Sequence, residues 1–204
     1  MKTFLIAEAG VNHNGIFQKA LEMIEVAKDA GADAVKFQTA VPELVMTRDA
    51  VKAEYQIQTT EENETQLEMA KKIHLPLDAY GKLKEKCDRL EIEFMSTAFD
   101  DVSIETLRKL GLKRVKIPSG EITNLPYLRQ VGRMGKPVVM STGMATLQEV
   151  EAAINVLLEA GVKKNDLTIL HCNTQYPTPM ADVNLMAMLT IRDELDVKVG
   201  YSDH

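Results

Sequence analysis

The chain has 204 residues, of which 45% are hydrophobic and 26% are charged, a composition typical of a globular protein with a sizeable core. The formal net charge of −6 argues against a general nucleic-acid binder, because phosphate contacts need a dense basic surface. The sequence holds no apolar run of the length that a membrane span requires. We therefore expect neither nucleic acid nor a membrane among the partners.

The N-terminal segment and the cysteines favour a cytoplasmic protein. Acidic Glu8 closes the first apolar run, where a secretory signal peptide would continue with apolar residues. Cys87 and Cys172 are the two cysteines, too few and too far apart for a disulfide framework or a thiolate zinc site. A reducing, cytoplasmic location follows as the expectation.

Short β-rich runs recur along the chain and alternate with segments of helical spacing. The spacing predicts seven strands, at 4–8, 34–39, 93–97, 114–119, 138–142, 168–173 and 197–202. Gly31 and Gly111 each precede one of these runs, and glycine just past a helix adopts the left-handed cap conformation at little cost. Nearly continuous apolar strands that alternate with helices indicate a parallel sheet covered by helices.

An open doubly wound sheet and a closed barrel both satisfy this pattern. The dinucleotide fingerprint G-x-G-x-x-G does not follow the first strand, and seven units in series favour the α/β (β/α)8 TIM barrel. Because such a barrel needs about 250 residues, we expect residues 1–204 to form an incomplete catalytic barrel, truncated after the seventh strand. Between the second and third strands we expect an irregular stretch at 40–62, a helix near 64–73, and a helix that Asp78 caps and that ends near residue 90.

Polar side chains stand at the ends of these apolar strands. Lys36 and Gln38 alternate with Val35 and Phe37, so the two polar residues share one face of the sheet. Similar residues close the other strands: Glu8, Ser96, Thr97, Lys116, Ser119, Glu121, Ser141, Thr142, His171, Asn173, Ser202, Asp203 and His204. Two lysines beside hydroxyls and the backbone N–H groups of the PSG and STG segments would form a cradle for phosphate or carboxylate.

Structural roles remain open for each of these residues taken singly. Lys36 and Lys116 could be plain ion-pair partners of Glu8 and Glu121. The Ser-Thr pairs could cap the helices that follow them, and His171 could be a hydrogen-bonded core histidine. The placement of so many polar groups at one end of successive strands is harder to obtain from structural need alone.

Several segments, in order and spacing, resemble the sialic acid synthase family, which includes N-acetylneuraminate, legionaminate and pseudaminate synthases. These segments are IAEAGVNHNG, AVKFQT, KAEYQI, TQLEMAKK, IPSGEITNLPYL, STGMAT, LHCNTQYPTP and GYSDH. The resemblance implies a transferase that condenses phosphoenolpyruvate with an open-chain N-acetylated mannose-type sugar. The product is a nine-carbon 2-keto acid, N-acetylneuraminate or N,N'-diacetyllegionaminate, and phosphate is released. It also implies a divalent metal, typically Mn2+, a C-terminal antifreeze-like domain absent from this chain, and a homodimer at full length.

Carried over position by position, the resemblance assigns roles to individual residues. Glu8 and Glu121 are expected to act at the reacting carbons, Gln38 and Tyr176 to bind the sugar, and His204 to ligate the metal. The residues expected to bind phosphoenolpyruvate are Lys36, Thr97, Lys116, Ser119, Ser141, Asn173, Thr174 and Ser202. The second metal ligand of the family lies beyond residue 204, so residues 1–204 alone are expected to be inactive.

Two other functions stay open from the residues. One is a different phosphoenolpyruvate-dependent or aldol-type barrel enzyme that acts on a phosphosugar. The other is a non-catalytic barrel whose cradle binds an anionic metabolite.

Overall fold

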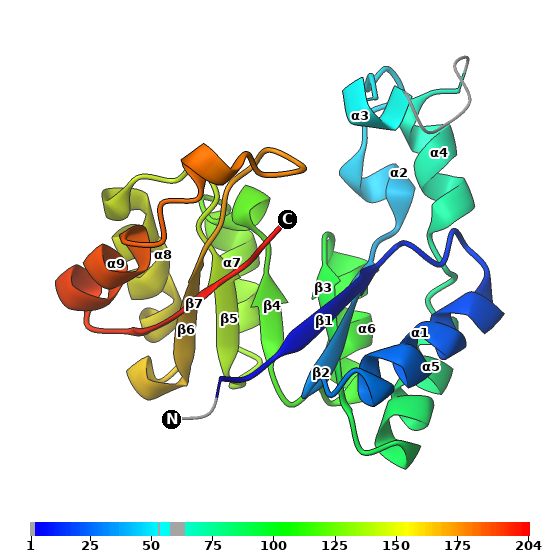
Figure 1. The fold of residues 1–204 in the computed structure, drawn as a ribbon, viewed down its shortest axis with the longest axis horizontal. Coiled ribbons are helices and arrows are strands. Elements are labelled where there is room, and N and C mark those ends of the chain that lie inside the picture. Colours follow the sequence, from blue (N-terminus) through cyan, green and yellow to red (C-terminus); the bar gives the residue numbers. More distant parts are fainter. Residues whose placement is uncertain (1–2, 53, 58–63) are drawn as a thin grey trace. The chain divides into compact units, whose positions relative to one another are not determined.

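The computed structural model describes residues 3–52, 54–57 and 64–204. The chain divides into two compact units, residues 1–113 and residues 114–204. In both units parallel strands alternate with helices, so the predicted α/β architecture is confirmed (Figure 1).

The described part of the first unit contains three parallel strands that pair in chain order. They are β1 (Ile6–Gly10), β2 (Ala34–Thr39) and β3 (Glu93–Ala98). Helices α1 (Phe17–Asp29), α5 (Ala79–Arg89) and α6 (Asp101–Leu110) pack against these strands, and α1 also contacts α5 (Figure 1). The buried side of this layer contains a stacked pair, Phe37 and Phe94, with ring centroids 5.9 Å apart. A fully buried aromatic side chain of this kind contributes about 1.5–3 kcal/mol to stability.

Three further helices follow β2 along the chain. They are α2 (Pro42–Val45), α3 (Glu54–Ile57) and α4 (Gln66–Ile73), and Figure 1 shows them beyond the ends of the strands of this unit. The irregular stretch predicted at 40–62 thus contains two short helices, while residues 53 and 58–63 lie outside the described residues. A capping box starts α4, in which Thr65 and Glu68 each bond the other's backbone N–H.

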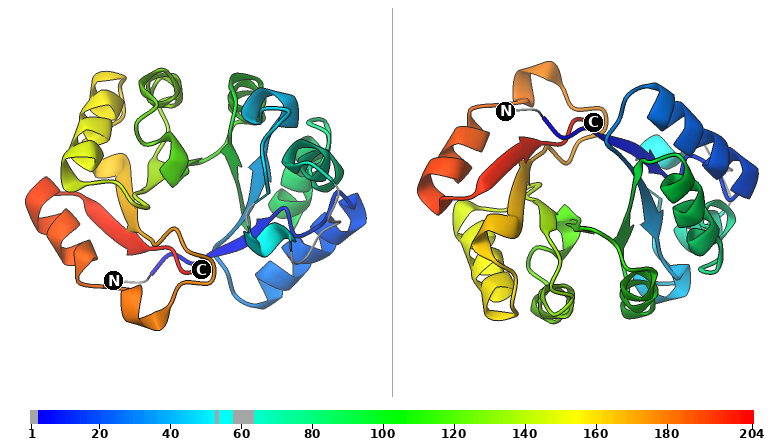
Figure 2. Two further views of the ribbon diagram at one scale, coloured as in Figure 1. Left: turned by 90° about the horizontal axis from the view of Figure 1, so that it is seen from above. Right: turned by 90° about the horizontal axis from the view of Figure 1, so that it is seen from below.

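The second unit contains four parallel strands in chain order. They are β4 (Val115–Ile117), β5 (Val138–Ser141), β6 (Leu167–His171) and β7 (Lys198–Tyr201). Helices α7 (Leu125–Gly132), α8 (Leu147–Glu159) and α9 (Ala187–Leu195) lie along one side of them in both views of Figure 2. Three short 3-10 helices, η1 (Ser119–Glu121), η2 (Lys164–Asp166) and η3 (Met180–Asp182), occupy the connections.

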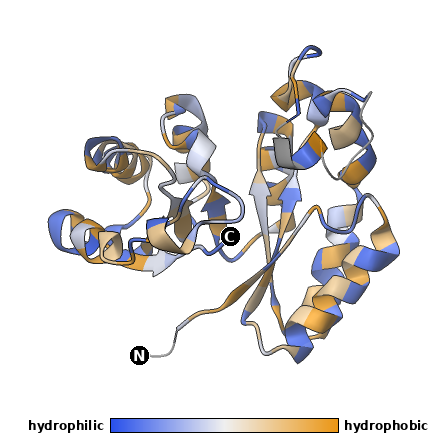
Figure 3. Cartoon of the chain, turned by 45° about the horizontal axis from the view of Figure 1, so that its top comes forward, coloured by the Kyte–Doolittle hydropathy of each residue, from blue (hydrophilic) through white to orange (hydrophobic). Residues whose placement is uncertain are grey.

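The longer helices of both units are amphipathic, and Figure 3 shows polar and apolar residues alternating around them. In α8 the buried residues are Val150, Ala153, Ile154 and Leu157, which matches the predicted helical spacing. Among the described residues, no helix has both the length and the apolar character needed to cross a lipid bilayer.

Two local predictions can be checked at helix ends. Gly111 ends α6 in the left-handed conformation, with φ +68, as predicted. The prediction that Asp78 caps α5 is wrong, because its backbone is already helical and its side chain accepts no capping hydrogen bond. The first turn begins earlier, where the N–H of Ala79 donates to the carbonyl of Pro76.

Candidate active site

Four of the predicted site residues share one face of the sheet in the first unit. The pairing register places Glu8 beside Lys36 and Gln38 beside Thr97. Phe37 lies between the two polar residues of β2 and is fully buried on the opposite, helix-covered face. The alternation read from the sequence therefore holds for this strand, and we call Glu8, Lys36, Gln38 and Thr97 the first polar cluster.

An ion pair joins two members of this cluster. The ammonium of Lys36 contacts the carboxylate of Glu8, and the Lys36 side chain is 14% exposed against 45% for Glu8. A Cβ on Gly10 would lie 3.2 Å from Oε1 of Glu8 and 3.8 Å from Nε2 of Gln38, so both side chains lie beside this backbone position. The ion-pair role left open for Lys36 is thus realised, and an anion bound here would share the ammonium with Glu8.

The strand-end hydroxyls of this unit are not helix caps. The carboxylate of Asp100 caps α6 by accepting the N–H of Ser103 at 2.8 Å. The hydroxyl of Ser96 bonds the hydroxyl of Thr39 at 2.7 Å on the helix-covered face. Thr97 is 2% exposed, and its register partner Gln38 places it on the polar face. The capping explanation therefore fails at Thr97.

The second unit contains the other predicted lysine. Lys116 on β4 is 5% exposed, and its ammonium donates to the Ser141 hydroxyl and to the Ile117 carbonyl, each at 2.7 Å. Ser141 does not cap α8, which begins instead with a capping box at Thr146 and Glu149. The structure thus brings Lys116 and Ser141 together at the ends of neighbouring strands, as an anion site requires.

Ser119 lies close to the two loops that follow β5 and β6. Its hydroxyl is 3.4 Å from the Cys172 thiol, and the N–H of Gly143 donates to the same sulfur at 3.3 Å. The Gly143 N–H, expected to face an anion as part of the STG segment, is therefore used within the protein. We call Lys116, Ser119, Ser141, Gly143 and Cys172 the second polar cluster.

The remaining predicted residues of this unit bond to nearby segments. The carboxylate of Glu121 accepts from the Asn124 side chain at 2.7 Å, and the Asn173 amide donates to the Asp182 carbonyl at 2.9 Å. The other side-chain atom of Asn173, Oδ1, is buried and has no hydrogen-bond partner among the described residues. A buried acceptor of this kind is available to a ligand or a water molecule.

Histidine and hydroxyl side chains follow β6 and β7. Nε2 of His171 bonds the carbonyl of Val183 at 2.8 Å, as expected of a structural histidine. The N–H of Ser202 donates to the His171 carbonyl at 2.9 Å, which ties the end of β7 to β6. Thr174 is exposed beside Gly143, where its Cγ2 would lie 3.2 Å from an added Cβ.

Tyr176 and His204 form a contact of their own. Their ring centroids are 4.1 Å apart, and the phenol oxygen is 3.2 Å from Nε2 of the imidazole. In the described part of the chain, no group of three or more His, Cys, Asp or Glu side chains could hold a metal ion. His204 is thus a single prospective ligand, and the described residues do not fit a complete metal site.

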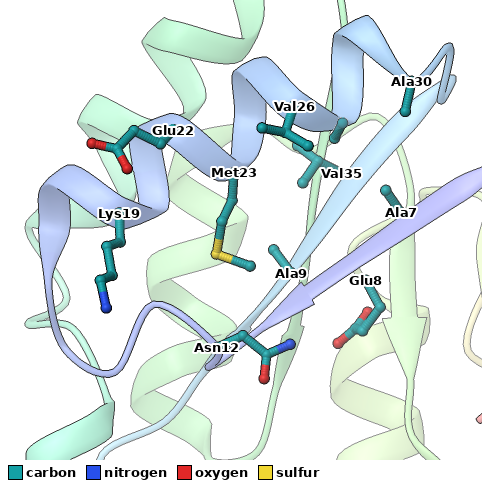
Figure 4. Close-up of a pocket in the computed structure, with 11 residues that line it drawn as sticks. Ala7, Glu8, Ala9, Asn12, Lys19, Glu22, Met23, Val26, Ala30 and Val35 are labelled. Carbon is teal, nitrogen blue, oxygen red and sulfur yellow. The ribbon is translucent and has the colours of Figure 1, made fainter.

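A groove of about 530 Å³ lies between α1 and β1, and Glu8 is among the residues that line it (Figure 4). Ala7 and Ala9 point toward the helix, and Met23 and Val26 point back from it. This lining is mostly apolar and holds few groups that could bind an anion, so the groove is not the candidate site.

Two histidines, buried His13 and half-buried His74, lie where α4 meets the loop after β1. His13 is fully buried, and its Nε2 has no hydrogen-bond partner among the described residues, while the N–H of Gly15 donates to Nδ1 at 3.2 Å. Burial lowers the pKa of His13, and the charge of His74 lowers it further. Burial also lowers the pKa of His74, against opposing effects of the Ala70 carbonyl and the Asp100 carboxylate.

Sequence reasoning missed Cys172 and the role of Gly143. Both lie in the segments STGMAT and LHCNTQYPTP, but a buried cysteine after an apolar strand is usually a core residue. The contact between the thiol and Ser119 joins residues 53 positions apart, which no local pattern indicates.

A match to a protein-family model identifies the family of this chain. The model of the NeuB family matches residues 23–204. The chain belongs to the NeuB family. Two similar relatives are named N,N'-diacetyllegionaminic acid synthase. The one from Campylobacter jejuni is 49% identical over 203 residues, and the one from Legionella pneumophila is 50% identical over 206 residues.

Both alignments include all of this chain, which spans 61% of the length of the Campylobacter relative and 58% of the Legionella relative. A solved structure of an N-acetylneuraminic acid synthetase from Leptospira borgpetersenii superposes with a TM-score of 0.85 at 31% identity. The superposition covers 100% of this chain and 66% of that one. The predicted membership in the sialic acid synthase family and the predicted (β/α)8-barrel fold class are both confirmed.

Proposed function

We propose that the full-length NeuB-family protein carrying this chain condenses phosphoenolpyruvate with an N-acetylated mannose-type sugar. The product is a nine-carbon 2-keto acid, and phosphate is released. The two relatives described above are named for N,N'-diacetyllegionaminic acid, which favours that product over N-acetylneuraminate.

One observation carries the proposal: a lysine ammonium is buried at a strand end beside a serine hydroxyl. Phosphoenolpyruvate has a phosphate and a carboxylate, and charge-assisted hydrogen bonds to such groups are the strongest in proteins. Lys116 and Ser141 supply a cation and a hydroxyl 2.7 Å apart, and Ser119 follows on the segment after β4. Lys36 supplies a second cation in the first polar cluster.

The reaction joins C3 of phosphoenolpyruvate to the aldehyde carbon of the open-chain sugar. Water adds at C2, and the bond from C2 to the phosphate oxygen breaks, with its electron pair leaving on phosphate. The water gives up two protons in all. A carboxylate accepts the first, which ends on the aldehyde oxygen as that oxygen becomes a hydroxyl, and Glu8 and Glu121 are the two candidates for this role. The second leaves the C2 hydroxyl for the departing phosphate as the keto group forms.

The other predicted residues complete the binding site in this proposal. Lys36, Lys116, Thr97 and the serines hold the two anionic groups, while Gln38 and Tyr176 contact the sugar. The buried Oδ1 atom of Asn173 supports the assignment of this residue to a ligand site. His204 would be one ligand of a divalent cation, Mn2+ by resemblance to the family. The described residues supply no complete ligand set for that ion.

The test is an assay of phosphate release by the full-length protein, followed by mass spectrometry of the product. Phosphate should appear only when phosphoenolpyruvate and an N-acetylated sugar are both present with a divalent metal. The product mass should equal the two substrates plus water minus phosphoric acid. Mannosamine-type, legionaminate-type and pseudaminate-type precursors are compared side by side.

Lys116→Ala should abolish this turnover, whereas Lys113→Ala, a change at an exposed lysine just before β4, should leave it unchanged. No turnover with any of the three precursors would refute the proposal. Binding of phosphoenolpyruvate without turnover would indicate a non-catalytic anion-binding protein, and a phosphosugar product would indicate the other aldol-type enzyme.

A further inference from the structure

The Cys172 thiol lies where three consecutive strand ends of the second unit meet. It follows β6, its sulfur is 3.4 Å from the Ser119 hydroxyl after β4, and it accepts the Gly143 N–H after β5 at 3.3 Å. The side chain is buried, with 3% of the residue exposed. One sulfur atom therefore joins two segments that both belong to the second polar cluster.

The backbone at Gly143 lies close to the Ser119 side chain. A Cβ there would lie 2.6 Å from Cβ of Ser119 and 2.9 Å from its Oγ, closer than real side chains approach. Gly143 also has φ +51, which residues with a side chain rarely adopt. The loop after β5 thus approaches Ser119 as closely as glycine allows, and the large sulfur atom fills the space beside both.

The hydrogen bonds around the thiol leave its S–H available to donate to the Ser119 hydroxyl. A thiol has one proton to donate and its sulfur can accept another. Since the Gly143 N–H donates to the sulfur, the S–H can donate to Oγ of Ser119. The Ser119 hydroxyl then keeps its own proton for an anion, which is the role assigned to it above.

We infer that Cys172 is a positioning residue, whose thiol orients the Ser119 hydroxyl for the anionic groups of phosphoenolpyruvate. This inference rests on the proposed function. Cys172 does not touch the substrate in this account, since its sulfur is enclosed by Ser119 and Gly143. It acts on the affinity for phosphoenolpyruvate through Ser119, and leaves the binding of the sugar unchanged.

The experiment is a double-mutant cycle on the full-length enzyme with Cys172→Ala, Ser119→Ala and the combined variant. Cys172→Ala should raise KM for phosphoenolpyruvate about three- to tenfold, the loss expected for one hydrogen bond. KM for the sugar should stay the same. Because Cys172 acts through Ser119, the combined variant should resemble Ser119→Ala to within about twofold.

Two further variants separate positioning from packing. Cys172→Ser keeps a donor and an acceptor and should recover most of the affinity. Cys172→Val keeps the bulk of the side chain but loses its hydrogen bonds, so KM for phosphoenolpyruvate should rise as it does in Cys172→Ala. We expect this result even if the alanine variant unfolds at a lower temperature than the wild type. Cys87→Ala, at the fully buried cysteine of α5, is the control and should leave both KM values unchanged.

Effects of Cys172→Ala and Ser119→Ala that multiply would overturn the inference, as would equal changes in KM for both substrates. A Cys172→Val variant with wild-type activity would also overturn the inference. These results leave the proposed function standing. A wild-type enzyme that releases no phosphate overturns the proposed function, and the assignment of Cys172 falls with it.

Discussion

Replacing Gly143 with alanine tests the close packing of the second polar cluster. A residue with a side chain in the left-handed region costs about 1–2 kcal/mol, and Gly143 has φ +51. The added methyl would also lie 2.6 Å from Cβ of Ser119 and 3.2 Å from Cγ2 of Thr174. Overpacking of this kind costs about 1–3 kcal/mol more. We expect the free energy of unfolding to fall by roughly 2–5 kcal/mol.

The matched control is Gly135→Ala in the same unit. Gly135 has φ +61, but a Cβ there would meet nothing within 4 Å. This variant should lose only the conformational term of about 1–2 kcal/mol. The difference between the two variants therefore isolates the clash of the added methyl with Ser119 and Thr174.

The assay is urea unfolding of the full-length protein together with KM for phosphoenolpyruvate. Gly143→Ala should shift the unfolding midpoint more than Gly135→Ala, and it alone should raise KM, because Ser119 must move. Equal midpoints and equal KM values in the two variants would refute the proposed packing of the loop on Ser119.

Three other perturbations have expected outcomes. Glu8→Gln removes the partner of Lys36, and because Glu8 is 45% exposed, stability should change by no more than about 1 kcal/mol while phosphate release falls steeply. The pKa values of His13 and His74 are lowered in the folded state, so the unfolded chain binds more protons below pH 6.5. The free energy of unfolding should therefore stay constant above pH 6.5 and decrease as the pH falls below it. His13→Asn should reduce the slope of this pH dependence, measured by urea unfolding. Thr146→Ala removes the capping box of α8 and should cost about 1 kcal/mol in the same measurement.

Each of these three predictions has an outcome that would contradict it. A large loss of stability in Glu8→Gln, measured by the same unfolding method, would mean that the ion pair is structural. An unchanged pH slope in His13→Asn would show that the burial of this imidazole does not govern acid sensitivity. For the helix cap, Thr106→Ala is the control, since the Thr106 hydroxyl bonds the Val102 carbonyl inside α6; equal losses at Thr146 and Thr106 would exclude a capping effect.

The strand and helix pattern was largely predictable because strands such as β2 to β5 are buried on their helix-covered face and the longer helices have one apolar side. The errors fall at boundaries. The fourth strand was expected at 114–119 but is Val115–Ile117, because Pro118 has no N–H for the ladder and Ser119 starts a 3-10 helix. The first strand begins at Ile6, two residues later than expected, and extends to Gly10.

The polar clusters could be predicted only in part. The alternation of Lys36 with Phe37 is a local signal, and the structure places the two residues on opposite faces as expected. The competing explanation, in which the strand-end hydroxyls cap helices, fails because Asp100 and Thr146 take that role. The contact of Cys172 with Ser119 depends on how three loops pack, and such packing has no signature in a single sequence.

The most direct measurement is a crystal structure of the full-length protein with phosphoenolpyruvate bound. We expect an anionic group of the ligand to lie within hydrogen-bond distance of the Lys116 ammonium and of the Ser119 hydroxyl. The Cys172 sulfur should remain between Ser119 and Gly143. Phosphoenolpyruvate bound away from Lys116 and Ser119, for example in the groove beside α1, would contradict the account.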